Sequence, residues 1–163
     1  MGSGCVYKCS ACGYSFEASV GVGFLYPDTY QETMAAARRG ELGEKVQQFL
    51  SEHPDGALDP SYQIACCLSC KRYETVQDLT MYFFPDGLPE PPGQWSIAFP
   101  AEGENYVDPG TMQQQGKIYA RYPHRCHSCG GKMKLLKRFS FQPLPCPNCR
   151  GKDLEPTRFI NWD

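Results

Sequence analysis

Short stretches rich in aromatic and β-branched residues, bounded by turn residues, recur along this chain and predict β-strands. They are Tyr7–Glu17 (two strands around a turn), Ser61–Cys66, Tyr73–Phe84, Lys117–Tyr122, Lys132–Phe141 and Thr157–Trp162. Each stretch is too short to bury a large core by itself. The pattern therefore predicts several small, antiparallel sheets.

A helical pattern occupies one interval, at about residues 28–53. Asp28 or Thr29 is the expected cap, and Thr29 has capping-box spacing to Glu32. Good helix formers fill residues 31–39, and Gly40 interrupts them. A second helix is expected from residue 41. Its apolar face consists of Leu42, Val46, Phe49 and Leu50. The His53-Pro54-Asp55-Gly56 run ends it.

Residues 85–116 are rich in Pro, Gly and acidic side chains and show no helical period. Trp95, Ile97 and Phe99 alternate briefly, which is compatible with a short strand. We expect a connector that joins two folded parts.

The most informative feature of the composition is its high cysteine content, ten residues in 163. Eight of them form four C-x-x-C pairs: Cys9/Cys12, Cys67/Cys70, Cys126/Cys129 and Cys146/Cys149. This spacing is typical of a metal site with four thiolate ligands. Cys5 and Cys66 are left over, and Cys66 is an alternative to Cys67 as ligand, although the two-residue spacing to Cys70 favours Cys67.

How the four pairs combine is open. The last two are separated by sixteen residues (130–145), enough for a two-stranded ribbon, and the first two by 54 residues (13–66). A helical insertion explains the longer interval. Each N-terminal pair could instead partner a C-terminal pair, but local closure costs less loop entropy. The expected sites are therefore local.

Zinc held by four thiolates is coordinatively full, so it stabilises the fold and activates no water. We expect two zinc ions and no catalysis. The chain shows none of the common catalytic motifs, and His124 and His127 are expected to be exposed beside Cys126 rather than to be ligands. Residues 1–8 have no apolar run typical of a signal peptide, and no stretch is long and apolar enough to span a membrane. A cytoplasmic protein is the expectation, because thiols stay reduced there.

The residues Tyr7-Lys8-Cys9-Ser10-Ala11-Cys12-Gly13-Tyr14-Ser15-Phe16-Glu17 resemble the opening turn of bacterial zinc ribbons, including small FmdB-type regulatory proteins. Their Cys-Gly-Tyr is also similar to the first metal-binding turn of rubredoxins. The C-terminal pairs resemble a standard zinc ribbon, and the whole layout resembles uncharacterised bacterial double-zinc-ribbon proteins. The resemblance implies a metal fold and no particular activity. Rubredoxins have glycine after the second pair, whereas this chain has Lys71 and Arg150 at the corresponding places.

The formal charge of −2 hides an asymmetry. Residues 1–70 carry a net −4, residues 71–116 a net −5 and residues 117–163 a net +7. Phosphate groups are attracted to such a basic segment. The candidate residues for a basic face are Arg121, Lys132, Lys134, Lys137 and Arg138.

Together these patterns predict a small, metal-stabilised α+β protein. We expect a zinc ribbon with a helical insertion at residues 1–84, the connector at 85–116 and a basic zinc ribbon at 117–163. The expected function is that of a non-catalytic adaptor or regulatory protein that binds a protein or nucleic acid. The alternatives are a rubredoxin-like iron electron carrier, with iron in the N-terminal site, a thiol redox switch, and an enzyme with an unrecognised site in the helical insertion.

Overall fold

The computed structural model describes residues 2–23, 25–88, 106–136 and 141–162. The chain forms two compact units, neither of which is continuous in sequence. The first, which we call the cysteine unit, consists of Met1–Gly23, Tyr62–Gln77 and Pro123–Asp163. The second, which we call the helical unit, consists of Phe24–Ser61 and Asp78–Tyr122. This division differs from the three consecutive segments expected from the sequence, because both ends of the chain belong to the same unit.

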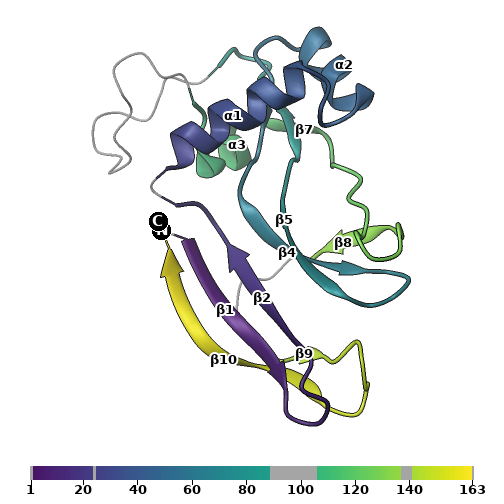
Figure 1. The fold of residues 1–163 in the computed structure, drawn as a ribbon. Helices are drawn as coiled ribbons and strands as arrows, with labels where there is room; N and C mark the ends of the chain where they lie inside the picture. Colours follow the sequence, from purple (N-terminus) through teal and green to yellow (C-terminus); the bar gives the residue numbers. More distant parts are fainter. Residues whose placement is uncertain (1, 24, 89–105, 137–140, 163) are drawn as a thin grey trace. The chain divides into compact units, whose positions relative to one another are not determined.

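The two ends of the chain meet in one sheet of the cysteine unit. Its strand order is β2-β1-β10-β9, built from β1 (Gly2–Cys9), β2 (Ser15–Val20), β9 (Leu144–Pro145) and β10 (Asp153–Trp162). The antiparallel ladder of β1 and β10 extends from Gly2, opposite Trp162, to Cys9, opposite Leu154. The strand predicted at Thr157–Trp162 is thus longer than expected and pairs with the first strand of the chain, as Figure 1 shows.

A second sheet of the cysteine unit has the order β5-β4-β8. It consists of β4 (Tyr62–Cys67), β5 (Tyr73–Gln77) and β8 (Met133–Leu135). Both sheets share one core, in which the ring of Phe16 stacks on Tyr7 at 5.0 Å and on Tyr73 at 5.5 Å between centroids. Tyr7, Tyr14 and Phe16 thus pack beside two of the C-x-x-C turns, since Cys9 and Cys146 lie in the same cluster.

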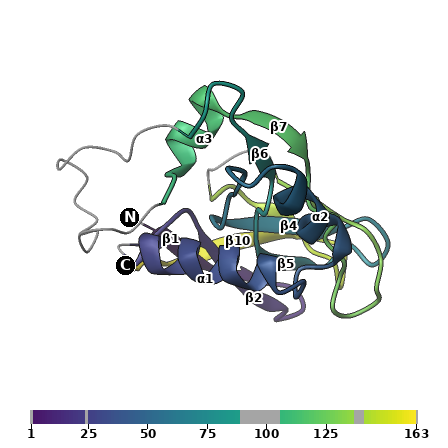
Figure 2. The same ribbon diagram turned by 90° about the horizontal axis from the view of Figure 1, so that it is seen from above.

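The helical unit contains α1 (Tyr26–Arg38), α2 (Glu44–Glu52) and α3 (Pro109–Gln115) with a sheet of order β3-β6-β7. The strands of this sheet are β3 (Ala57–Leu58), β6 (Met81–Phe83) and β7 (Lys117–Ala120). In Figures 1 and 2, α3 leads directly into β7. The core takes Val46, Phe49 and Leu50 from α2, which confirms that part of the predicted apolar face.

Two local predictions about helices need correction. Helix α1 begins at Tyr26 with Pro27 in its first turn, earlier than the predicted cap at Asp28 or Thr29. The connector contains α3, whose cap is the Asp108 side chain accepting a hydrogen bond from the Thr111 N–H at 3.0 Å. The brief alternation at residues 95–99 lies outside the described residues.

The long strand predicted at Tyr73–Phe84 is divided into β5 and β6. Leu79 takes a φ of 54° between them, and the side chain of Asp78 accepts a hydrogen bond from the Thr80 N–H at 3.0 Å. This side-chain turn diverts the chain from the cysteine unit into the helical unit. No helix in the described ranges is long and apolar enough to span a bilayer.

Candidate metal centres

The eight predicted ligands gather into two clusters, each with all four sulfurs within 4.8 Å of one another. Site 1 consists of Cys9, Cys12, Cys146 and Cys149, and site 2 of Cys67, Cys70, Cys126 and Cys129. Each site therefore combines one N-terminal pair with one C-terminal pair. The local pairing expected from the sequence is wrong. Cys67, not Cys66, contributes its sulfur to a site.

Local pairing does cost less loop-closure free energy, but the difference is small. Loop closure costs (3/2)RT ln n, so loops of 133 and 55 residues in place of 54 and 16 cost only about 2 kcal/mol more in total. The pairing of β1 with β10 offsets this, because it buries Cys5, Tyr7 and Leu154 almost completely. Burying one large apolar side chain alone contributes about 1.5–3 kcal/mol. The pairing of the strands, and not the loop entropy, thus determines which C-x-x-C pairs share a site.

The sulfur positions fit a tetrahedral metal. In site 1 the Sγ atoms of Cys9 and Cys149 are 3.6 Å apart, and in site 2 those of Cys67 and Cys129 are 3.5 Å apart. Two sulfurs bound at about 2.3 Å to one tetrahedral ion are about 3.8 Å apart, whereas a disulfide bond is about 2.05 Å long. All ten cysteines are free. Each cluster could therefore hold one metal ion, in the manner of a zinc ribbon.

One backbone conformation recurs in all four C-x-x-C turns. The residue after the second cysteine has a positive φ, and its N–H donates to the carbonyl oxygen of the first cysteine at 2.8–3.2 Å. The four residues and their φ values are Gly13 (74°), Lys71 (64°), Gly130 (68°) and Arg150 (56°). At Gly13 this conformation costs little, because glycine has no Cβ atom. A residue with a side chain pays about 1–2 kcal/mol for this conformation, so Lys71 and Arg150 are strained where glycine is not.

Hydrogen-bond donors surround the sulfurs of both sites. In site 2, the Cys70 N–H lies 3.4 Å from the Sγ of Cys67, and this bond lowers the pKa of Cys67 to about 6. In site 1, the side-chain amide of Asn148 hydrogen-bonds to Cys12 and, with the Tyr14 N–H, lowers the pKa of Cys12 to about 6. Since a metal binds the thiolate and not the thiol, Cys67 and Cys12 are the sulfurs that these donors prepare for a cation. Asn148 is a supporting residue that the sequence pattern did not indicate.

Site 2 differs from site 1 in having a carboxylate against one sulfur. Glu74 Oε1 lies 3.2 Å from Cys126 Sγ, and the Glu74 carboxylate is held by the His127 N–H at 3.1 Å and by His127 Nδ1 at 2.8 Å. Burial, and then the hydrogen bond to Glu74, raises the pKa of Cys126 to about 12. His127 is exposed as predicted, but His124 is buried, contrary to the prediction. Glu74 was also not found from the sequence, because its contact with Cys126 depends on which C-x-x-C turns meet.

Glu74→Gln is expected to increase the affinity of site 2 for its metal. Binding turns Cys126 into a thiolate beside the Glu74 carboxylate, whereas a glutamine amide donates to the same sulfur. A hydrogen bond to a charged group contributes about 1.5–3 kcal/mol, so an increase of about tenfold or more is expected. Competition against a chromogenic chelator measures it, with exposed Glu17→Gln on β2 as the matched control. A lower affinity would mean that Glu74 itself contacts the metal.

The basic face predicted from the sequence is only partly described. Lys132 and Lys134 are exposed in the cysteine unit, whereas Arg121 belongs to the helical unit. Lys137 and Arg138 lie outside the described residues. The five residues are therefore not shown to form one surface.

Comparison of the chain with protein-family models, with curated protein sequences and with solved structures finds no match. The sites themselves define the class of protein: a chain of helices and antiparallel strands with two four-cysteine centres that could each hold a metal ion.

Proposed function

We propose that both centres hold zinc in two interleaved zinc ribbons, and that the protein is a non-catalytic adaptor or regulator. The observation that carries this proposal is the pair of complete four-sulfur clusters. Four thiolates fill the coordination of a tetrahedral zinc ion, leaving no position for water or substrate. The metal then stabilises the cysteine unit, which has a small core of its own. The ten free thiols suit a reducing compartment, so we place the protein in the cytoplasm.

Charge separates the two units and supports a binding role for the cysteine unit. That unit contains eleven Lys and Arg against five Asp and Glu, a net +6, and the helical unit five against thirteen, a net −8. Each filled site adds −2 by charge counting. The cysteine unit remains positive at +2 with both sites filled. An acidic partner, protein or nucleic acid, is the kind of partner it would attract.

The helical unit contains a cavity of about 470 Å³ near α1, which is the natural place to look for an enzyme site. Its charged lining residues are Arg38 and Asp55, and none of its lining residues is Cys, His, Ser or Thr. Among its described lining residues there is therefore no Ser, Thr or Cys nucleophile paired with a His base. This composition favours the non-catalytic function.

A second candidate function is redox chemistry, as an iron electron carrier or a thiol switch. It is favoured by the exposure of Cys12, Cys129 and Cys149, since each site thus presents at least one ligand to solvent. Exposed thiolates are accessible to oxidants, and an exposed cluster is accessible to a redox partner.

Elemental analysis and a visible spectrum of the same purified sample test the proposal. We expect about two zinc ions per chain and no colour. A strong chelator should abolish the folded cysteine unit, and added zinc should restore it. A red protein that contains iron would replace the adaptor with the electron carrier.

A further inference from the structure

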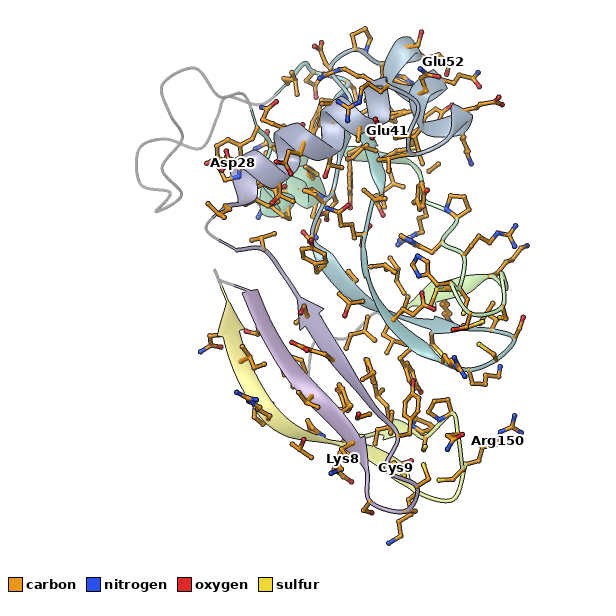
Figure 3. All side chains as sticks on the ribbon, in the orientation of Figure 1. Lys8, Cys9, Asp28, Glu41, Glu52 and Arg150 are labelled. Carbon is orange, nitrogen blue, oxygen red and sulfur yellow. The ribbon has the colours of Figure 1, made fainter. Side chains whose placement is uncertain are left out.

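The cysteine unit presents exposed cations at every metal-binding turn. Nine of its Lys and Arg residues are described, all are exposed, and none of these nine forms an ion pair with a described residue. Seven of the nine lie within three residues of a ligand cysteine: Lys8, Lys71, Arg72, Arg125, Lys132, Arg150 and Lys152. In Figure 3, Lys8 and Arg150 lie at the same end of the unit as Cys9. The unit thus has solvated positive charge around its metal sites.

Two of these cations occupy positions that favour glycine. Lys71 and Arg150 have positive φ angles, and the equivalent positions of the other two turns are Gly13 and Gly130. A Cβ atom built on either glycine meets nothing within 4 Å. A side chain would therefore fit without a clash at either glycine. Conversely, glycine would relieve the backbone strain at Lys71 and Arg150. A function of the Lys71 and Arg150 side chains explains why these positions keep a strained residue in place of glycine.

The side chains of Lys71 and Arg150 have N–H groups that are not used in hydrogen bonds with the described residues. Lys71 Nζ donates to the Leu68 carbonyl oxygen at 2.7 Å, which occupies one of its three N–H groups. The Arg150 guanidinium makes no hydrogen bond or ion pair with the described residues. Both are free to contact an external anion.

The distribution of exposed apolar side chains points to the class of partner. Four of the six large apolar side chains recorded as exposed belong to the helical unit: Leu25, Leu88, Ile118 and Tyr119. The cysteine unit has the other two, Phe159 and Leu68, of which Leu68 lies within the Cys67–Cys70 turn. Protein interfaces are centred on buried apolar and aromatic anchors, whereas phosphate contacts are made by Lys, Arg and backbone N–H groups. The surface around the metal-binding turns fits phosphates better than it fits a protein.

We propose that the cations of the four metal-binding turns, with Lys71 and Arg150 foremost, bind the phosphodiester backbone of a nucleic acid. This inference rests on the proposed function, since it needs the metal-loaded cysteine unit as the binding module. The competing role for these cations is to neutralise the two negative tetrathiolate sites. Neutralisation predicts weaker metal binding when they are removed, whereas phosphate recognition predicts weaker nucleic-acid binding with the metals retained.

The test uses the zinc-loaded full chain and fluorescein-labelled 20-nucleotide probes: single-stranded DNA, single-stranded RNA and duplex DNA. Fluorescence anisotropy at several salt concentrations gives the affinity and its salt dependence for each. Each phosphate contact adds about 0.7 to the slope of log K against log salt on a single strand. The double variant K71G/R150G is therefore expected to lower the slope by about 1.4. Its zinc content and melting temperature should not fall, because glycine suits both turns.

The matched control removes two exposed cations from the helical unit, K45Q/K117Q, and is expected to leave the slope unchanged. Equal binding by wild type and K71G/R150G would overturn the inference while leaving the proposed function in place. The same holds if no probe binds the zinc-loaded protein, or if poly-glutamate competes as well as DNA. Loss of zinc from K71G/R150G would assign these cations to the metal sites instead. A chain without bound metal would refute the proposed function itself.

Discussion

Cys146→Ser is expected to remove the metal from site 1 and to unfold the four-stranded sheet at both ends of the chain. Cys146 contributes one of the four sulfurs of that site and is 2% exposed within the core that contains Tyr7 and Leu154. Structural zinc contributes on the order of 10–16 kcal/mol in small modules, which equals or exceeds the whole stability of a typical domain. A serine leaves three thiolates and a buried hydroxyl. The loss is therefore expected to be complete for this sheet.

The interleaved pairing makes this result distinctive. Cys146 lies near the C-terminus, yet β1 and β2 near the N-terminus should lose protection from hydrogen exchange. Cys66→Ser is the control, because Cys66 lies next to a ligand and outside both sites. It should keep two metals and a native melting curve. If Cys146→Ser also kept two metals, site 1 would not be as described.

Tyr7→Ala is expected to destabilise the cysteine unit by about 3–5 kcal/mol, the usual cost of truncating a buried aromatic side chain. Tyr7 is 1% exposed, and its ring stacks on Phe16 at 5.0 Å. Denaturant unfolding of the zinc-loaded protein measures the change.

Tyr7→Phe separates packing from hydrogen bonding. The Tyr7 hydroxyl donates to the Gln142 carbonyl oxygen at 3.1 Å, so the phenylalanine variant loses this bond and keeps the stack. Its cost should be about 0.5–1.5 kcal/mol. Equal losses for the two variants would show that the stacked rings contribute little.

The local chemistry of the sites could be predicted from the sequence, because it depends on residues a few positions apart. The C-x-x-C pairs, the positive φ of Gly13 and the end of a helix at His53 all depend on neighbours along the chain. The pairing of the sites depends on which strands meet, and nothing near Cys9 in the sequence indicates β10. The preference for short loops was the available guide, and it is outweighed by sheet formation.

The same distinction explains which supporting residues were missed. Asn148 acts on Cys12, which is 136 positions away in the chain, and Glu74 acts on Cys126, which is 52 away. Neither contact has a sequence signature until the pairing is known. The helix α3 is different, since Asp108 before Pro109 is a local cap signal within a segment whose Pro and Gly content indicated a connector.

The distribution of charge also depends on the topology. The basic segment at residues 117–163 is divided between the units, because Lys117 and Arg121 belong to the acidic helical unit. Lys8, Lys71 and Arg72 come instead from segments that are acidic on average. The fold thus concentrates cations around the metal-binding turns more sharply than the order of the chain suggests.

The metal content of two double variants tests the interleaved pairing most directly. C9S/C149S changes two ligands of site 1 only, so it should retain one metal per chain, whereas C9S/C67S changes one ligand of each site and should retain none. Elemental analysis of both variants, with the wild type at two metals, gives the answer. The opposite result, one metal in C9S/C67S and none in C9S/C149S, would show that the sites are formed by neighbouring pairs and would contradict the account.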